Sequence, residues 1–226
     1  MRRDNVQNVV YDWLWSPKNP VSSYHAYHEI LKLIPDDSKI LDVGAGTGIY
    51  FSNPAVVELI KSKNLSIKCI DIDQNALEGC RARIAESGLE DRVSAECMEL
   101  PNETARYDYV FMIMLFPLVE LDLFTKYINH ARNITNSAII AYHNLVEKKD
   151  KLLAFLKSNL KYLVGVDFGR TTTVAEMEEY INSLGFNKWS MSKLLTAKYS
   201  DLFKAVKYLP IFDYSFDQYL LTLKLN

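Results

Sequence analysis

The chain has 226 residues, 49% of them apolar, which is enough to build the core of one α/β domain. Its 26 basic and 28 acidic residues give a net charge of -2, and this balance argues against a nucleic-acid-binding protein. No apolar run is long enough to span a membrane, and the three cysteines form no CxxC pair. We therefore expect a cytoplasmic protein with reduced cysteines and no metal site.

Predicted strands and helices alternate along most of the chain. The apolar runs that predict strands lie at residues 39–43, 67–70, 93–97, 107–115, 138–142, 187–194 and 218–225. Asn53 and Pro54 have the form of a helix start, and Thr173 to Glu176 have the form of a capping box. This alternation predicts a mostly parallel sheet that is covered by helices on both faces.

Helical spacing assigns a buried face to two of the helices. A helix over residues 21–34 is expected to bury Val21, Tyr24, His28 and Leu31. A helix that opens at Pro117 is expected to bury Leu118, Leu121, Thr125 and Ile128. His25 falls on the more polar face of the first helix, so it reaches a pocket only if that helix acts as a lid.

We expect a single domain over residues 1–226 with two additions to its sheet. Residues 1–34 form an N-terminal helical cap that is rich in aromatic side chains. Residues 196–217 form an aromatic insertion between the last two strands, where a minimal fold needs only a hairpin. Both segments are expected to cover the open carboxyl edge of the sheet and to enclose an aromatic-lined pocket.

The main motif is the stretch from Lys39 to Gly48, an apolar strand that ends in three glycines spaced two apart. Glycine lets a ligand approach the backbone closely. Asp71 and Glu96 end the next two strands, and the carboxyl ends of parallel strands meet at one edge. Asp71 suits a ribose diol and Glu96 an exocyclic amine. Taken alone, Asp71 also reads as a helix cap and Glu96 as a solvated loop carboxylate.

These motifs, in this order, resemble the class I S-adenosylmethionine-dependent methyltransferases, in particular the small-molecule type. Residues 40–48 resemble the first motif of the family, 69–73 the second, 95–101 the third and 107–110 the opening of the fourth. The resemblance covers residues 36–195 and the last strand. It implies a seven-stranded, mostly parallel sheet with helices on both faces and an antiparallel last strand.

The resemblance also implies S-adenosylmethionine as the cofactor. The residues expected to bind it are Asp42, Gly44, Ala45, Gly46, Gly48, Asp71, Ile72, Glu96, Cys97 and Met112. The sequence favours this donor over the dinucleotide of a dehydrogenase, because the G-x-G-x-x-G fingerprint would need a glycine at Ile49.

The chain departs from the family pattern at three places. The interval from Gly48 to Asp71 is longer than usual, and residues 135–137 replace a common Gly-Gly pair. The fourth strand lacks the Asn/Asp-Pro-Pro-aromatic motif of enzymes that methylate amino groups of nucleic-acid bases. Its absence argues against that reaction.

Methyl transfer from a sulfonium is an in-line displacement from an activated donor, so no catalytic residue is obligatory. His143, after the fifth strand, is the candidate general base. Tyr11 belongs to a Tyr-Asp element that resembles one near the N-terminus of small-molecule members, where the tyrosine approaches the donor. Candidate acceptor-binding residues are Trp13, Trp15, His25, Met114, Arg170, Tyr199 and Phe203. Purely structural roles stay open for each of them.

We therefore expect an enzyme that methylates an oxygen or nitrogen atom of a small, partly aromatic or apolar acceptor. A protein or RNA methyltransferase and a catalytically silent S-adenosylmethionine-binding subunit remain as alternatives. The expected partner is the small-molecule acceptor, with neither a membrane nor nucleic acid. The sequence leaves the acceptor and the oligomeric state open, a homodimer included.

Overall fold

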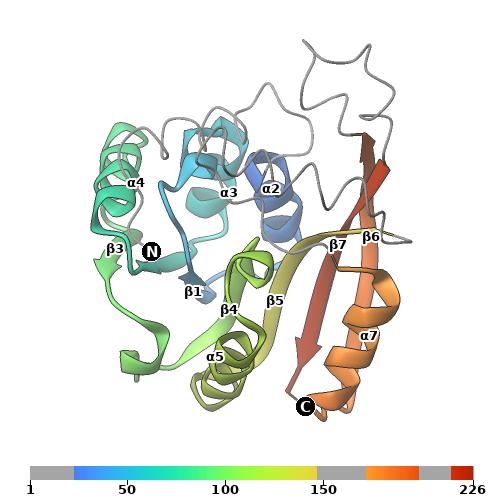
Figure 1. Cartoon of the computed structure of the whole chain (residues 1–226). Coiled ribbons are helices and arrows are strands. Elements are labelled where there is room, and N and C mark those ends of the chain that lie inside the picture. The colour runs from blue at the N-terminus through green and yellow to red at the C-terminus, as the bar shows by residue number, and fades with distance from the viewer. Residues whose placement is uncertain (1–22, 147–171, 199–214, 226) are drawn as a thin grey trace.

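The computed structural model describes residues 23–146, 172–198 and 215–225. Its strands are β1 (Lys39–Val43), β2 (Ser66–Asp71), β3 (Val93–Cys97), β4 (Tyr107–Ile113), β5 (Thr135–Leu145), β6 (Lys188–Lys198) and β7 (Ser215–Lys224). They form one sheet in the order β3-β2-β1-β4-β5-β7-β6 (Figure 1). Strands β1 to β5 pair in parallel, whereas β7 runs antiparallel to both β5 and β6. The predicted sheet is confirmed.

Helices cover both faces of this sheet, as predicted. They are α2 (Ser23–Leu33), α3 (Pro54–Ser62), α4 (Gln74–Glu86), α5 (Leu121–Ile134) and α7 (Val174–Ser183), with short 3-10 turns η1 (Ile49–Ser52), η2 (Leu100–Asn102) and η3 (Phe116–Leu118). Helices α2, α3 and α4 pack on one face, and α5 and α7 on the other (Figure 1). No helix among the described residues is long and apolar enough to cross a membrane.

Local capping signals explain where three of these helices begin. The Asn53 side chain accepts a hydrogen bond from the N–H of Ala55 at 3.1 Å, next to the proline that opens α3. Asp73 caps α4 through the N–H groups of the next turn. Thr173 and Glu176 form the complete predicted capping box at the start of α7. Each cap satisfies backbone donors that a helix leaves without intrahelical partners.

Helix α2 buries a face that agrees only in part with the predicted one. Its buried residues are Ala26, Tyr27, Ile30 and Leu31, followed by Ile34 directly after the helix. His28, expected in the core, is half-exposed and contacts the carboxylate of Glu29. The prediction was wrong for His28 because the buried face is centred on Tyr27 and Ile30, and it is confirmed for Leu31.

Helix α5 shows a similar correction. Proline 117 lies in η3, and the α-helix begins four residues later. The residues that α5 buries are Phe124, Tyr127, Ile128, Ala131 and Ile134. Leu121 was expected to be buried, but it is exposed on the first turn of the helix. Of the predicted stripe within the helix, only Ile128 lies in the core.

The predicted insertion is shorter than its assigned bounds. Strands β6 and β7 stay paired up to Lys198 and Ser215, so residues 196–198 and 215–217 belong to the sheet. Residues 199–214 lie outside the described residues, as do residues 1–22 of the predicted N-terminal cap. The rest of that cap is α2, which packs against the sheet.

Candidate active site

A glycine turn connects the end of β1 to η1. Gly44, Gly46 and Gly48 have φ angles of 75, 56 and 61°, in the left-handed region that disfavours residues with a side chain. The N–H groups of Gly44 and Ala45 both donate to the carbonyl oxygen of Ile70, at 2.8 and 3.2 Å. The turn is thereby held against the end of the neighbouring strand β2.

The three glycines differ in what a side chain at their positions would meet. A Cβ atom on Gly44 would lie 2.9 Å from Cδ1 of Leu115, and one on Gly48 would lie 2.6 Å from Sγ of Cys80. A Cβ atom on Gly46 would meet no atom within 4 Å. Gly46 therefore borders open space, while its two neighbours are packed against the protein.

Asp71, at the end of β2, is bonded to the glycine turn through its carboxylate. Oδ2 accepts the N–H of Gly46 at 2.8 Å, and Oδ1 accepts the N–H of Asp73 at 2.9 Å. The next side chain, Ile72, is apolar yet 52% exposed. An exposed isoleucine beside an anchored carboxylate is the surface expected where a ribose and its base bind.

The end of β3 lies beside these residues. The N–H of Met98 donates to the carbonyl oxygen of Asp71 at 3.0 Å, and Sγ of Cys97 lies 3.7 Å from the carbonyl oxygen of Ile72. Glu96 extends from the same strand and forms an ion pair with Lys68. The structure thus brings the glycine turn, Asp71, Ile72, Glu96 and Cys97 to one edge of the sheet.

Asp42 lies two residues before the turn and is fully buried. Its Oδ2 atom accepts a hydrogen bond from the hydroxyl of Tyr50, whose ring stacks on Tyr27 with centroids 3.8 Å apart. Oδ1 has no hydrogen-bond partner in the described part of the chain. Burial raises the pKa of the Asp42 carboxyl to about 7, against the opposing effect of the Tyr50 hydroxyl.

The raised pKa of Asp42 predicts that folding stability depends on pH. Between the ordinary value of 3.8 and the folded-state value of about 7, the folded protein binds the proton more tightly than the unfolded chain. We therefore expect the free energy of unfolding to fall as the pH rises through this window, by at most about 4 kcal/mol. Urea unfolding at a series of pH values measures the slope.

Asp42→Asn is the control for this pH dependence, because the amide keeps the shape of the side chain and does not titrate. The variant is expected to lose the slope between these pH values. An unchanged slope in Asp42→Asn would assign the effect to other groups.

Two predicted methionines, one in β4 and one directly after it, have different surroundings. Met112, expected at the cofactor, is fully buried in the core that faces α5. Met114 follows the strand, is half-buried and has a φ of 57°, which is uncommon for a residue with a side chain. Its N–H donates to the carbonyl oxygen of Tyr142 at 2.9 Å. Met114 thus redirects the chain at the edge where the glycine turn lies.

The two predicted histidines lie on opposite sides of the sheet. His143, in β5, is 2% exposed, and the rings of Phe116 and Phe124 lie 5.0 and 6.2 Å from its ring. His25 is exposed on α2. The proposed base is therefore a buried side chain, and its role stays a prediction.

Several predicted residues cannot be placed. Outside the described residues lie Tyr11, Trp13, Trp15, Arg170, Tyr199 and Phe203. Their predicted roles toward the donor or the acceptor stay predictions.

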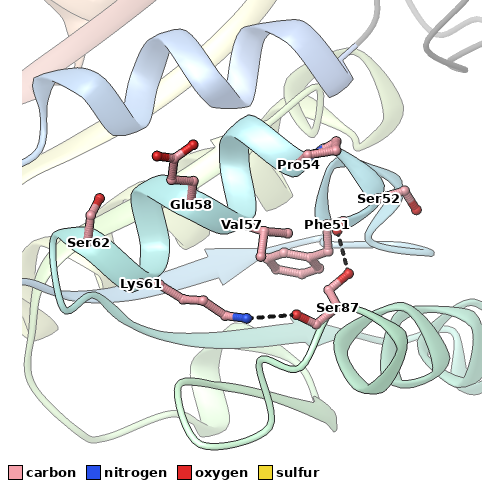
Figure 2. Close-up of a pocket in the computed structure, with 8 residues that line it drawn as sticks. All are labelled: Phe51, Ser52, Pro54, Val57, Glu58, Lys61, Ser62 and Ser87. Carbon is pink, nitrogen blue, oxygen red and sulfur yellow. Dashed lines mark hydrogen bonds between the residues drawn. The ribbon is translucent and has the colours of Figure 1, made fainter.

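A groove of about 540 Å³ lies away from the predicted site residues, between α3 and the end of α4. Figure 2 shows the residues that line it, with the Lys61 ammonium donating to the carbonyl oxygen of Ser87 at 3.1 Å. The hydroxyl of Ser87 in turn donates to the carbonyl oxygen of Phe51 at 2.8 Å. These bonds connect the end of α4 to η1, directly after the glycine turn.

Sequence reasoning missed four residues that support the site: Tyr27, Tyr50, Lys68 and Glu103. Tyr27 lies on α2 and Tyr50 on η1, so no local sequence pattern predicts that their rings stack. Lys68 did offer a signal, since it is a charged residue inside an otherwise apolar predicted strand. Such a residue needs a partner when it is partly buried.

The residues present fit the adenosyl part of S-adenosylmethionine. Gly46 leaves room for a ligand against the backbone, and Asp71 supplies an anchored carboxylate. The exposed side chain of Ile72 offers an apolar contact for the base. Asp42 adds a buried carboxylate oxygen without a partner in the described residues, close in sequence to the turn.

Known proteins similar to this chain are methyltransferases. The family model described as a methyltransferase domain matches residues 40–137. The methyltransferase GfsG of Streptomyces halstedii is 37% identical over 78 residues, which are 33% of this chain and 26% of that protein. The match thus spans about a quarter of that relative.

Solved structures with the same fold share little sequence with the chain. Magnesium protoporphyrin IX methyltransferase from Synechocystis, with bound SAH, has a TM-score of 0.60 at 13% identity, over 97% of this chain and 96% of that chain. Phosphoethanolamine N-methyltransferase 2 of Haemonchus contortus, in complex with S-adenosyl-L-methionine, has a TM-score of 0.66 at 12% identity, over 96% of this chain and 56% of that chain.

These similarities confirm the predicted fold and the resemblance to class I methyltransferases. They also place a match to a methyltransferase domain over residues 40–137, where the predicted motifs of the first strands lie. They do not test the individual site residues.

Proposed function

We propose that this chain, which carries a methyltransferase domain within a class I methyltransferase fold, methylates an oxygen or nitrogen atom of a small, partly aromatic or apolar acceptor. The observation that carries the proposal is the bond from the N–H of Gly46 to Asp71, beside the open space at Gly46. It joins the glycine turn and the acidic strand end into one donor subsite.

The residues of this subsite have separate tasks. When bound, S-adenosylmethionine supplies a methyl group that the positive charge of its sulfur has activated for in-line transfer. Asp71 is placed to accept hydrogen bonds from ribose hydroxyls, and Glu96 from the amine of the base. Gly46 keeps the backbone clear of side-chain bulk. The protein's main contribution is to align the reactants and to exclude water.

Apolar residues after β4 support a small apolar acceptor. Met114 and Leu115, both partly buried, follow the strand at the same edge of the sheet as the glycine turn, and a Cβ atom on Gly44 would lie 2.9 Å from Cδ1 of Leu115. The names of the two structural neighbours given above likewise refer to small molecules, a porphyrin and phosphoethanolamine. An acceptor that must lose a proton would need a base, and we propose His143 for that role.

The proposal predicts that the full chain binds S-adenosylmethionine and S-adenosylhomocysteine in a calorimeter. With a labelled methyl donor, a panel of small phenols, amines and apolar acids is expected to give a labelled product that depends on the enzyme. The matched control is the same panel with Gly46→Ala, which is expected to give no product.

Each other outcome of this screen has a distinct meaning. Failure of the parent chain to bind either donor form would refute the methyltransferase function itself. Binding together with label transferred to protein or RNA, and not to small molecules, would refute the proposed acceptor class. Binding with no transfer to any acceptor would favour a silent subunit.

A further inference from the structure

We propose that Lys68 is a positioning residue of the donor subsite, which orients the carboxylate of Glu96 and thereby makes the site selective for an adenine base. This inference rests on the proposed function, because it assigns Glu96 to the amine of the donor's base. It goes beyond that function by naming a residue that does not contact the donor.

Lys68 bridges two carboxylates that differ sharply in exposure. Its ammonium lies 2.7 Å from Oε2 of Glu96 and 2.6 Å from Oε2 of Glu103. The side chain of Glu103 is 5% exposed, whereas that of Glu96 is 59% exposed. The buried carboxylate of Glu103 therefore fixes the ammonium of Lys68, and this ammonium in turn orients the exposed carboxylate of Glu96.

Backbone N–H groups fix Glu103, the buried member of the Glu96–Lys68–Glu103 cluster. Oε1 of Glu103 accepts the N–H groups of Thr104 and Ala105, at 2.9 and 2.8 Å. Burial acts to lower the pKa of Lys68, but the two carboxylates outweigh it and raise that pKa above its ordinary value. Lys68 is therefore charged at neutral pH.

The position of Lys68 in the sheet explains how a lysine fits inside a parallel strand. The chain passes from β3 to β4 through the short turn η2, without a covering α-helix. Lys68 lines a hollow of about 210 Å³ on this part of the sheet, together with Ser66, Ser94 and Tyr107. Glu96 lies two residues beyond Ser94, the register partner of Lys68, so the side chains of Lys68 and Glu96 share one face of neighbouring strands.

Orienting Glu96 matters because an exposed glutamate has many rotamers. Binding an amine through such a side chain loses much of that freedom, whereas an ion pair restricts it beforehand. A carboxylate has two oxygens, and the Lys68 contact engages one of them. The other is then directed by the same contact and can accept from the exocyclic amine of adenine. A base that carries an oxo group at that position offers no donor there.

The test compares two ligands in the full chain: S-adenosylhomocysteine and S-inosylhomocysteine, in which an oxo group replaces the amine. The ratio of their dissociation constants is expected to favour the adenosyl form in the parent. Lys68→Met is expected to lower this preference about 5-fold, which is the scale of an exposed ion pair. Glu96→Gln should lower it at least as much, and the double variant no further than Glu96→Gln.

Two control variants separate an effect on the orientation of Glu96 from a general loss of stability or binding. Lys68→Arg keeps the cation and is expected to keep the preference. Lys39→Met removes another lysine that lines the same hollow and should leave the ratio unchanged. If Lys68→Met does not fold, Glu103→Gln provides a second route, because it weakens the anchor of Lys68 and should lower the preference in the same direction.

The ratio is insensitive to global stability, because both ligands bind the same folded protein. Equal weakening of both ligands in Lys68→Met would give Lys68 a structural role and overturn the inference. So would additive effects in the double variant, or no effect of Glu96→Gln on the ratio. In all three cases the methyltransferase function would stand, whereas it would fail if the parent bound neither S-adenosylhomocysteine nor S-adenosylmethionine.

Discussion

A Gly46→Ala variant is expected to fold as the parent chain does and to bind S-adenosylhomocysteine at least about 100-fold more weakly. The added methyl group meets no protein atom within 4 Å, so it extends into the space that we assign to the donor. The left-handed backbone adds a strain of about 1 kcal/mol. Calorimetry measures the affinity, and urea unfolding measures the stability.

Gly185→Ala is the matched control for Gly46→Ala, and Gly48→Ala is a contrasting variant in the same turn. Gly185, after α7, also has a positive φ and free space around its Cβ position, so alanine there adds the same strain without touching the donor subsite. Gly48→Ala places a methyl group against Cys80 and Phe51 and is expected to destabilise the fold by about 2–4 kcal/mol. Donor binding that survives in Gly46→Ala would contradict the assignment of the open space.

Asp71→Ala is the second substitution for which we expect a large effect. It removes the acceptor for the N–H of Gly46 and the carboxylate assigned to the ribose hydroxyls. Two hydrogen bonds to a charged acceptor contribute about 3 kcal/mol to binding, so donor affinity should fall about 100-fold. Calorimetry with S-adenosylhomocysteine checks this value.

Asp108→Ala provides the comparison for Asp71→Ala. Asp108 also accepts a backbone N–H, that of Lys39 at 2.8 Å, but it lies near the start of β4 and so at the opposite edge of the sheet. This variant should lose some stability and keep its donor affinity. Equal losses of affinity in the two variants would show that Asp71 acts through the fold and not through the donor.

The strand positions and helix caps were predictable because they depend on neighbours in sequence. The run from Val93 to Cys97 matches β3 residue for residue, and the capping box at Thr173 lies where the pattern placed it. The buried faces of α2 and α5 were predicted only in part, because apolar residues such as Tyr27 and Leu121 lie on more than one side of these helices. Which of them face the core depends on contacts with distant strands.

The residues that support the site, such as Tyr50 and Lys68, could not be predicted for a similar reason. The hydroxyl of Tyr50 reaches back across the glycine turn to Asp42, and Lys68 contacts a glutamate 35 positions further along the chain. Such contacts follow from the register of the sheet. The motifs assigned to the donor are local, since Asp71 is the last residue of β2 and Glu96 the last but one of β3, and they could be read before the fold was known.

The stack of Tyr27 on Tyr50 connects α2 to the glycine turn of the proposed donor subsite. Tyr27 comes from a helix that precedes the first strand, while Tyr50 comes from the turn's own exit and bonds to Asp42. The packing of α2 against the sheet and the ordering of the glycine turn are therefore energetically coupled. Reciprocity then requires that a bound donor strengthens the packing of this helix by the same factor by which that packing strengthens donor binding. We therefore expect a replacement of α2 to change the affinity of the proposed donor subsite.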